Sequence, residues 1–218
     1  MPSALPSAPR ASATPASAIA LITASLRSNG NGDGFAAWLI TRFDAVAVSR
    51  SSHHTLALAS TFSPLPLPYG PFEDTVISQA ITSPNAYTDP AVRAWSATVS
   101  ATPAVVILTP QYNWGYPGQL KNLLDHVYHE WRDKCVVLVT YGGHGGSRCA
   151  EQLKIVLEGG LHMQLVGEVG VVLPREFIRA EKRVGMEEEA AFLAEYEGAV
   201  DAAFAKLLDG LEGAEVAS

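Results

Sequence analysis

Five short apolar runs recur along the chain, and their pattern constrains the fold more than any other feature. Three of them are continuously apolar instead of alternating between apolar and polar residues, which is typical of central strands buried on both faces of a sheet. Segments with helical spacing lie between the runs, and strands that alternate with helices predict a parallel sheet covered on both sides. The predicted strands are residues 19–23, 55–60, 104–109, 135–141 and 168–173, of which the first, third and fourth are continuously apolar.

Two segments carry apolar stripes with helical spacing. From Leu120 to Trp131, apolar residues follow at i, i+3, i+4, i+7 and i+11, which predicts one helix with a buried stripe. A similar stripe runs from Leu193 to Leu208, and Gly210 is a plausible end of that helix. The region 61–90 contains six prolines. We expect a loop-rich excursion there, which could be a lid or part of an oligomer contact.

Composition and charge exclude several classes of protein. The chain of 218 residues is 48% apolar and 17% charged, which indicates a globular protein, most simply of one domain. The formal charge of −7 and the lack of a Lys/Arg stripe argue against a nucleic-acid partner. No apolar run reaches the roughly 18 residues of a membrane span. We therefore expect neither nucleic acid nor membrane as a partner.

The two ends of the chain differ in composition from its centre. Residues 1–18 are rich in Ser, Ala and Pro, lack the apolar core of a signal peptide and hold less arginine than a transit peptide usually does. We expect a disordered tail at 1–18, a folded domain at 19–210 and a flexible C-terminus at 211–218.

The chain has two cysteines, Cys135 and Cys149. Two cysteines cannot make a disulfide framework, and their spacing matches no zinc pattern. We therefore expect both to be small buried apolar residues. A reducing, intracellular setting suits such thiols, and we expect a cytoplasmic protein.

The loop after the first predicted strand, residues 23–34, favours an anion. In an open parallel sheet, ligands bind beyond the carboxyl ends of the strands, so the loops after strands are the informative ones. Here Ser25 offers a hydroxyl, Arg27 a fork of donors, and the helix starting near Phe35 a positive dipole end. The glycines match neither a dinucleotide fingerprint nor a nucleotide P-loop. The loop predicts a phosphate site, and a merely flexible turn is the alternative.

The loop after the third predicted strand, TPQYNWGYPGQLKN at 109–122, is unusually aromatic. Asn113 can offer a donor and an acceptor to the edge of a planar heterocycle, and Tyr112, Trp114 and Tyr116 supply flat surface for stacking. Pro117 suits the start of the following helix. The aromatics could instead only pack the corner between strand and helix, but three of them in five residues favour a planar ligand.

The loop after the fourth predicted strand, TYGGHGGSR at 140–148, is rich in glycine. Glycines let the backbone pass close to the edge of a ligand. Ser147 lacks the G-x-S-x-G frame of a hydrolase nucleophile, so a serine hydrolase is disfavoured. His144 could be a proton donor, a cofactor contact or a solvated loop residue.

On the preceding predicted helix, His126, His129 and Glu130 have a spacing that could hold a metal, but no further ligand follows at an obvious spacing, and we assign no metal.

The three loops together predict a site for a phosphorylated planar ligand. Flavin mononucleotide (FMN) suits all three.

These motifs resemble those of the flavodoxin-like NADPH-dependent FMN reductase family, which includes related quinone, chromate and azo-dye reductases. The resemblance is carried by Ser25-x-Arg27, by residues 109–131 and by residues 139–153, and spans roughly residues 18–205. It implies an α/β flavodoxin-like three-layer sandwich with a five-stranded parallel sheet of order 2-1-3-4-5. The region 19–210 would then be an FMN-binding domain.

The resemblance also implies roles for individual residues. Ser25 and Arg27 would bind the FMN phosphate. The other implied contacts are Pro110, Gln111, Tyr112, Asn113 and Trp114 along the isoalloxazine and ribityl chain, and Tyr141, Gly142 and Gly143 at the ring's other edge.

Three positions depart from the family pattern. The family usually has Glu where this chain has Gln111, often Gly at Ala24, and frequently a second Arg at Gly30. The loss of that Arg would remove one charge-assisted phosphate contact, typically worth about 1.5–3 kcal/mol. Two consequences for FMN binding therefore stay open. FMN could bind weakly and exchange, or the protein could use flavin as a substrate.

The implied activity is transfer of a hydride from NAD(P)H, through flavin, to free flavin, a quinone or another small acceptor. FMN and NADPH are the implied cofactors. The flavin carries the chemistry, so no general acid or base is needed and we assign no catalytic side chain. Arg148 could meet the 2′-phosphate of NADPH or be structural. A homodimer or homotetramer is expected from the family.

Three alternatives stay open. One is a quinone or xenobiotic reductase with tightly bound FMN. The second is a flavodoxin-like electron carrier without intrinsic NADPH oxidation, and the third is a flavin-free scaffold on the same fold. Flavodoxins are commonly acidic around the flavin, whereas Arg27, Lys121 and Arg148 lie near the three loops here. That charge pattern favours a reductase.

Overall fold

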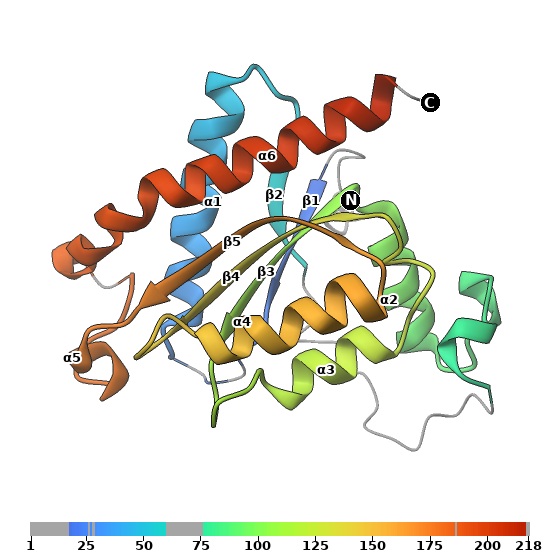
Figure 1. The fold of residues 1–218 in the computed structure, drawn as a ribbon, viewed down its shortest axis with the longest axis horizontal. Helices are drawn as coiled ribbons and strands as arrows, with labels where there is room; N and C mark the ends of the chain where they lie inside the picture. Colours follow the sequence, from blue (N-terminus) through green and yellow to red (C-terminus); the bar gives the residue numbers. More distant parts are fainter. Residues whose placement is uncertain (1–17, 26, 28, 60–75, 186, 217–218) are drawn as a thin grey trace, which may run out of the picture.

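The computed structural model describes residues 18–25, 27, 29–59, 76–185 and 187–216. Its centre is a sheet of five parallel strands in the order β2-β1-β3-β4-β5 (Figure 1). The predicted fold class and strand order are thus confirmed. The strands are β1 (Ala18–Thr23), β2 (Thr55–Leu58), β3 (Ala104–Pro110), β4 (Cys135–Gly142) and β5 (Gln164–Val172).

Helices cover both faces of the sheet and give three layers (Figure 1). α1 and α6 pack on one face, where the core contains Phe35, Phe43 and Phe204. α2, α3 and α4 pack on the other face, where Trp95 and Trp131 are fully buried. The helices are α1 (Gly32–Ser49), α2 (Pro90–Ala101), α3 (Gly118–Asp125), α4 (Ser147–Lys154), α5 (Arg175–Ile178) and α6 (Glu197–Val216), with short 3₁₀ helices η1 (Ser78–Ala80), η2 (Pro84–Ala86) and η4 (Glu187–Tyr196) and a π-helix η3 (Ile155–Gly160).

The strands that are continuously apolar in sequence are the central ones. β3 is buried along its whole length, and β1 and β4 are buried except at their last residue, because helices cover both of their sides. β5 begins four residues before the predicted start at 168. Its burial is mixed because it forms one edge of the sheet.

α3 ends at Asp125, earlier than the stripe to Trp131 predicts, although all five side chains of that stripe are buried. The last carbonyl groups of a helix have no partner inside it. Two of them find partners here, because the indole Nε1 of Trp95 donates to Leu123 O at 3.0 Å and that of Trp131 donates to Leu124 O at 3.1 Å. The tryptophans therefore satisfy the end of this helix, and the apolar stripe continues through turns.

The C-terminal stripe is divided between η4 and α6, with non-helical backbone angles at Ala190. α6 continues past Gly210 to Val216, so the helix end predicted at Gly210 is wrong. A Cβ atom at Gly210 would lie 2.8 Å from Cys135 Sγ. The lack of a side chain at Gly210 therefore allows α6 to pack closely on β4.

Parts of the predicted organisation lie outside the described residues. They include residues 61–75 of the excursion, Ser60 of the predicted strand 55–60, and the tail apart from Ala18, which begins β1. The described end of the excursion contains η1 and η2 and leads into α2, which Asp89 caps by accepting from Ala91 N at 2.6 Å. None of the helices within the described ranges combines the length and hydropathy of a membrane span.

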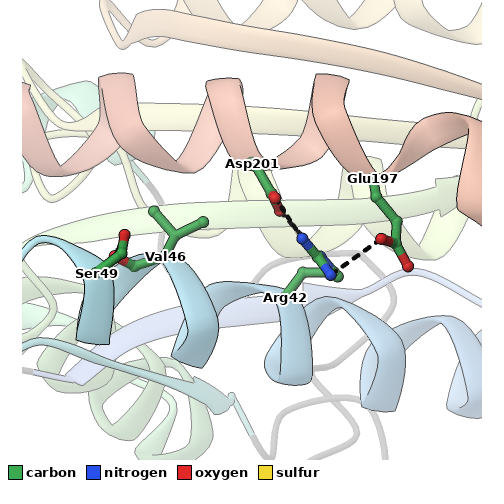
Figure 2. Close-up of polar contacts among 5 residues, drawn as sticks. All are labelled: Arg42, Val46, Ser49, Glu197 and Asp201. Atoms are coloured by element: carbon green, nitrogen blue, oxygen red, sulfur yellow. Dashed lines mark hydrogen bonds and ion pairs between the residues drawn. The ribbon is translucent and has the colours of Figure 1, made fainter.

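An ion-pair network joins α1 to α6 (Figure 2). Arg42 Nε donates to Asp201 Oδ1 at 3.0 Å and Arg42 Nη1 donates to Glu197 Oε2 at 3.1 Å. Its Nη2 also pairs with Asp201, so the guanidinium holds that carboxylate with both prongs of its fork. The hydrogen bond to Asp201 raises the pKa of Arg42. The Arg42 network therefore fixes the C-terminal helix against the helix that starts beside the first loop.

Replacing Arg42 by alanine is expected to lower the free energy of unfolding by about 1 kcal/mol, because the network is bidentate but partly exposed to solvent. For a domain of this size, that corresponds to a fall of about 2–4 °C in Tm in a thermal melt. Arg132 is exposed and takes part in none of the ion pairs found among the described residues, so Arg132→Ala serves as a control with the same charge change. Equal Tm values for the two variants would contradict the prediction.

Candidate functional site

The three loops predicted to carry the site meet at the carboxyl edge of the sheet around one cavity of about 360 Å³. They follow β1, β3 and β4, which are neighbours where the strand order reverses. Such switch points are where open α/β sheets bind ligands, and the volume is within the usual range for a ligand pocket. The predicted site residues that line the cavity are Ser25, Arg27, Pro110, Gln111, Tyr112, Tyr141, Gly142 and Gly143.

Ser25, Arg27 and Tyr112 form the polar end of this cavity. Ser25 Oγ and the Tyr112 hydroxyl are hydrogen-bonded at 3.1 Å, and the backbone N–H of Arg27 donates to Ser25 Oγ at 3.4 Å. The Arg27 guanidinium lies over the Tyr112 ring, with Cζ 5.0 Å from its centroid. The first loop and the aromatic loop are far apart in sequence, but these contacts join them into one continuous surface of the cavity.

Tyr141 lines the cavity near the end of β4. Its ring stacks on Phe35 of α1 with centroids 4.6 Å apart. Burial raises the pKa of Tyr141 well above its usual range, although a hydrogen bond with Ser25 acts in the opposite direction. The Tyr141 hydroxyl therefore stays protonated near neutral pH.

The N-terminus of α1 opens on the same cavity without a side-chain cap. Asn31 occupies the cap position, but among the described side chains none caps this helix end. The Asn31 side chain points elsewhere: its Nδ2 donates to Phe177 O at 3.2 Å and its Oδ1 accepts from Val184 N at 3.1 Å. Free N–H groups at a helix N-terminus favour an anion, so this end of the cavity is suited to phosphate.

α4 has the opposite arrangement, because Gln111 caps it. Gln111 Oε1 accepts from Arg148 N at 3.1 Å and from Cys149 N at 3.3 Å. The backbone N–H of Gln111 donates to Tyr141 O at 3.0 Å. Gln111 therefore joins the aromatic loop to the glycine loop, and an amide oxygen suffices for this cap where the family usually has a carboxylate.

The three aromatics of the second loop have separate positions. Tyr112 lines the cavity, whereas Asn113 and Trp114 form the tip of a tight turn in which Tyr112 and Gly115 exchange two backbone hydrogen bonds of 2.9 Å. Trp114 is 68% exposed, and its ring lies under the guanidinium of Arg148, with Cζ 5.4 Å from the ring centroid. Tyr116 is partly buried and packs against the core on the face of the sheet that α2, α3 and α4 cover. Among the described cavity-lining residues, Asn113 and Trp114 are not found, and their role as cofactor contacts stays a prediction.

Sequence reasoning missed one wall of the cavity. The segment that follows β5, including α5, also lines it, as do two residues of the first loop. These residues are Gly30, Asn31, Leu173, Phe177, Ile178, Ala180 and Arg183. The segment follows the carboxyl end of β5, at the same edge of the sheet as the three loops. Because ligands bind beyond the carboxyl ends of parallel strands, its place in the sequence alone predicts that it lies near the site. Its sequence, PREFIRAEKRVG, carries no recognisable binding motif.

Other predicted candidates lie outside this cavity. His144 is exposed at the tip of the glycine loop. Among the described residues, no group of three or more His, Cys, Asp or Glu side chains is placed to hold a metal. A larger cavity of about 790 Å³ lies between the end of α3 and η3, and of the residues of the three loops only Lys121, which belongs to α3, is among its described lining residues. Convergent polar groups mark a ligand site better than volume does, so the smaller cavity is the better candidate.

Both cysteines are buried free thiols, as predicted. Burial raises the pKa of the Cys149 thiol to about 12, and burial also raises that of Cys135. Both therefore stay protonated at neutral pH, and thiolate chemistry is disfavoured.

The residues present fit FMN. Arg27, Ser25 and the uncapped end of α1 supply donors for a phosphate, and none of the described lining residues is acidic. The Tyr112 ring and Pro110 supply a flat wall. A Cβ atom at Gly143 would lie 3.2 Å from Ile178 Cδ1, a tight contact with an exposed side chain, so glycine leaves the most room at that edge of the cavity.

Known proteins are similar to this chain in sequence and in fold. The sequence model of NADPH-dependent FMN reductases matches residues 17–177. NAD(P)H-dependent FMN reductase LOT6 of Saccharomyces cerevisiae is 48% identical over 108 residues, which are 50% of this chain and 56% of the yeast protein. NAD(P)H-dependent FMN reductase C4B3.06c of Schizosaccharomyces pombe is 47% identical over 93 residues, 42% of this chain and 46% of that protein. The chain thus matches about half the length of these relatives.

A solved structure supports the fold. FerB, a flavoenzyme NAD(P)H:(acceptor) oxidoreductase from Paracoccus denitrificans, is 22% identical and superposes with a TM-score of 0.58. The match covers 89% of this chain and 98% of that chain. The flavodoxin-like architecture therefore agrees with the strand order described above.

Proposed function

Because the chain belongs to the NADPH-dependent FMN reductase family, we propose that it is an NAD(P)H-dependent oxidoreductase that binds FMN in the 360 Å³ cavity. Its acceptor would be free flavin, a quinone or another small molecule. The observation that carries the proposal is the cavity itself, which lies at the switch point of the sheet and combines cationic donors with an aromatic wall and bare glycine backbone.

When bound, FMN would supply the hydride chemistry, which no side chain provides. Ser25, Arg27 and the N-terminus of α1 would hold the phosphate. Pro110, Gln111 and Tyr112 would line the ring from β3, and Gly142 and Gly143 would border its other edge. Asn113 and Trp114 are kept as proposed contacts of the bound ligands. These residues would bind and orient the reactants, and the proposal needs no side chain that accepts or gives a proton.

We also propose a homodimer or homotetramer in the cytoplasm. Support for association comes from the exposed apolar side chains of Val76, Ile77 and Ile155, which line the 790 Å³ cavity together. Support for a reducing compartment comes from the two free thiols.

One experiment on the purified protein tests the activity. We expect saturable FMN binding, seen as quenching of flavin fluorescence, and oxidation of NADPH at 340 nm when FMN or a quinone is added. FMN binding without NADPH or NADH oxidation would instead indicate an electron carrier. A protein that binds no FMN in the titration would contradict the proposal.

A further inference from the structure

Arg183 places a second guanidinium at the phosphate end of the cavity. It comes from the segment after α5, about 150 residues from the first loop in sequence, yet it lines the same cavity as Ser25 and Arg27. Arg183 Nε donates to Asn29 O at 2.7 Å, and Nη1 donates to Lys182 O at 2.8 Å. Asn29 belongs to the first loop, so the Arg183 guanidinium lies beside that loop.

Arg183 keeps donors for a ligand. A guanidinium has five N–H groups, and the two contacts found within the described chain use two of them. Arg27 and Arg183 are the basic side chains among the described lining residues, and none of those residues is acidic. Two guanidinium forks suit a dianionic phosphate, which offers several acceptor oxygens.

The position of Arg183 is fixed by close packing of its neighbours on the start of α1. Val184 N donates to Asn31 Oδ1 at 3.1 Å. A Cβ atom at Gly34 would lie only 1.8 Å from Val184 O, so the two backbones touch there. The first loop and residues 183–185 are therefore packed together, and the contacts of Arg183 with Asn29 O and Lys182 O hold its side chain beside that loop.

From this arrangement we propose that Arg183 is a second cationic ligand of the FMN phosphate and replaces the Arg side chain that Gly30 lacks. Gly30 and Arg183 line the same cavity, so the charge missing from the first loop is supplied from the C-terminal segment. The proposal rests on the proposed function, because it assumes that FMN occupies this cavity. It names Arg183 as a residue that selects phosphorylated flavin over riboflavin.

The test compares the affinities of FMN and riboflavin, which differ by the phosphate. Arg183→Gln is expected to weaken FMN binding about tenfold while riboflavin binding stays unchanged, because only the phosphate contact is lost. Arg179→Gln is the matched control: Arg179 is exposed, lies four residues away, and is not among the described lining residues. It is expected to leave both affinities unchanged. Unchanged riboflavin affinity also shows that a variant is folded.

Three outcomes would overturn the assignment of Arg183. The first is an FMN-to-riboflavin affinity ratio in Arg183→Gln equal to that of the native protein. The second is an equal loss for both flavins, which would indicate a structural role. The third is the same loss of FMN affinity in Arg179→Gln, which would indicate a general charge effect. A native protein that binds neither flavin would overturn the proposed function itself.

Discussion

Replacing Arg27 by alanine is expected to weaken FMN binding by about 10- to 150-fold, which corresponds to hydrogen bonds to a charged group worth about 1.5–3 kcal/mol. Arg27 reaches the cavity from the loop after β1, next to Ser25 and the uncapped end of α1. The effect exceeds that expected for Arg183, because two donors of the Arg183 guanidinium are already bound to carbonyl oxygens.

The quantity that checks this prediction is again the ratio of FMN to riboflavin affinity, measured by fluorescence titration. Arg27 also lies over the Tyr112 ring, and a cation–π contact is worth about 0.5–1 kcal/mol at an exposed site. Riboflavin is therefore expected to lose up to about fivefold in affinity. Arg175→Ala, an exposed arginine near the same edge, controls for net charge. If the two flavins lose affinity equally in Arg27→Ala, the phosphate is not at this loop.

The central sheet could be predicted because burial on both faces imposes a local signal. β3 and β4 have partners on two sides and helices on two faces, so nearly every position must be apolar. The edge strand β5 has no such constraint, and its first four residues were not predicted.

The end of α3 was not predicted for a different reason. It depends on two indole N–H groups, one of which comes from α2, a distant element.

The site was predictable where a motif directly follows a strand. The three loops do lie together, because parallel strands bring their carboxyl ends to one edge. The wall from Leu173 to Arg183 was not predicted, because its residues carry no recognisable motif. The different positions of Tyr112 and Trp114 also could not be read from composition. They follow from a turn in which Asn113 and Trp114 both have positive φ angles of 47° and 70°.

The departure at Gln111 has a structural meaning that the sequence did not reveal. Its side chain caps α4 through two backbone N–H groups. A cap needs an acceptor oxygen, which an amide and a carboxylate both provide. Gln111 thus keeps the link between the two loops without the negative charge of the usual Glu, in a cavity in which none of the described lining residues is acidic. A neutral Gln111 is consistent with binding an anionic cofactor.

Gly34→Ala is expected to give the largest loss of stability among these variants. The new Cβ atom would lie 1.8 Å from Val184 O and 2.2 Å from Val184 C, which are backbone atoms that no rotamer change can move away. We expect a cost of about 3 kcal/mol, at the upper end of the usual range for overpacking, and a Tm lower by about 6–12 °C. The displaced backbone would also break the hydrogen bond from Val184 N to Asn31 Oδ1 and move Arg183 out of the cavity.

A matched control exists in α6. At Gly198 an added Cβ would have no atom within 4 Å, and alanine is a better helix former than glycine by about 0.5–1 kcal/mol. Gly198→Ala is therefore expected to melt at the native temperature or slightly above it and to bind FMN normally. In Gly34→Ala, by contrast, the lower Tm should be accompanied by a loss of FMN affinity at least as large as in Arg183→Gln, measured at a temperature where the variant is folded. A Gly34→Ala protein that melts like the native one would mean that residues 184–185 do not pack on the start of α1, and the position assigned to Arg183 would then lose its support.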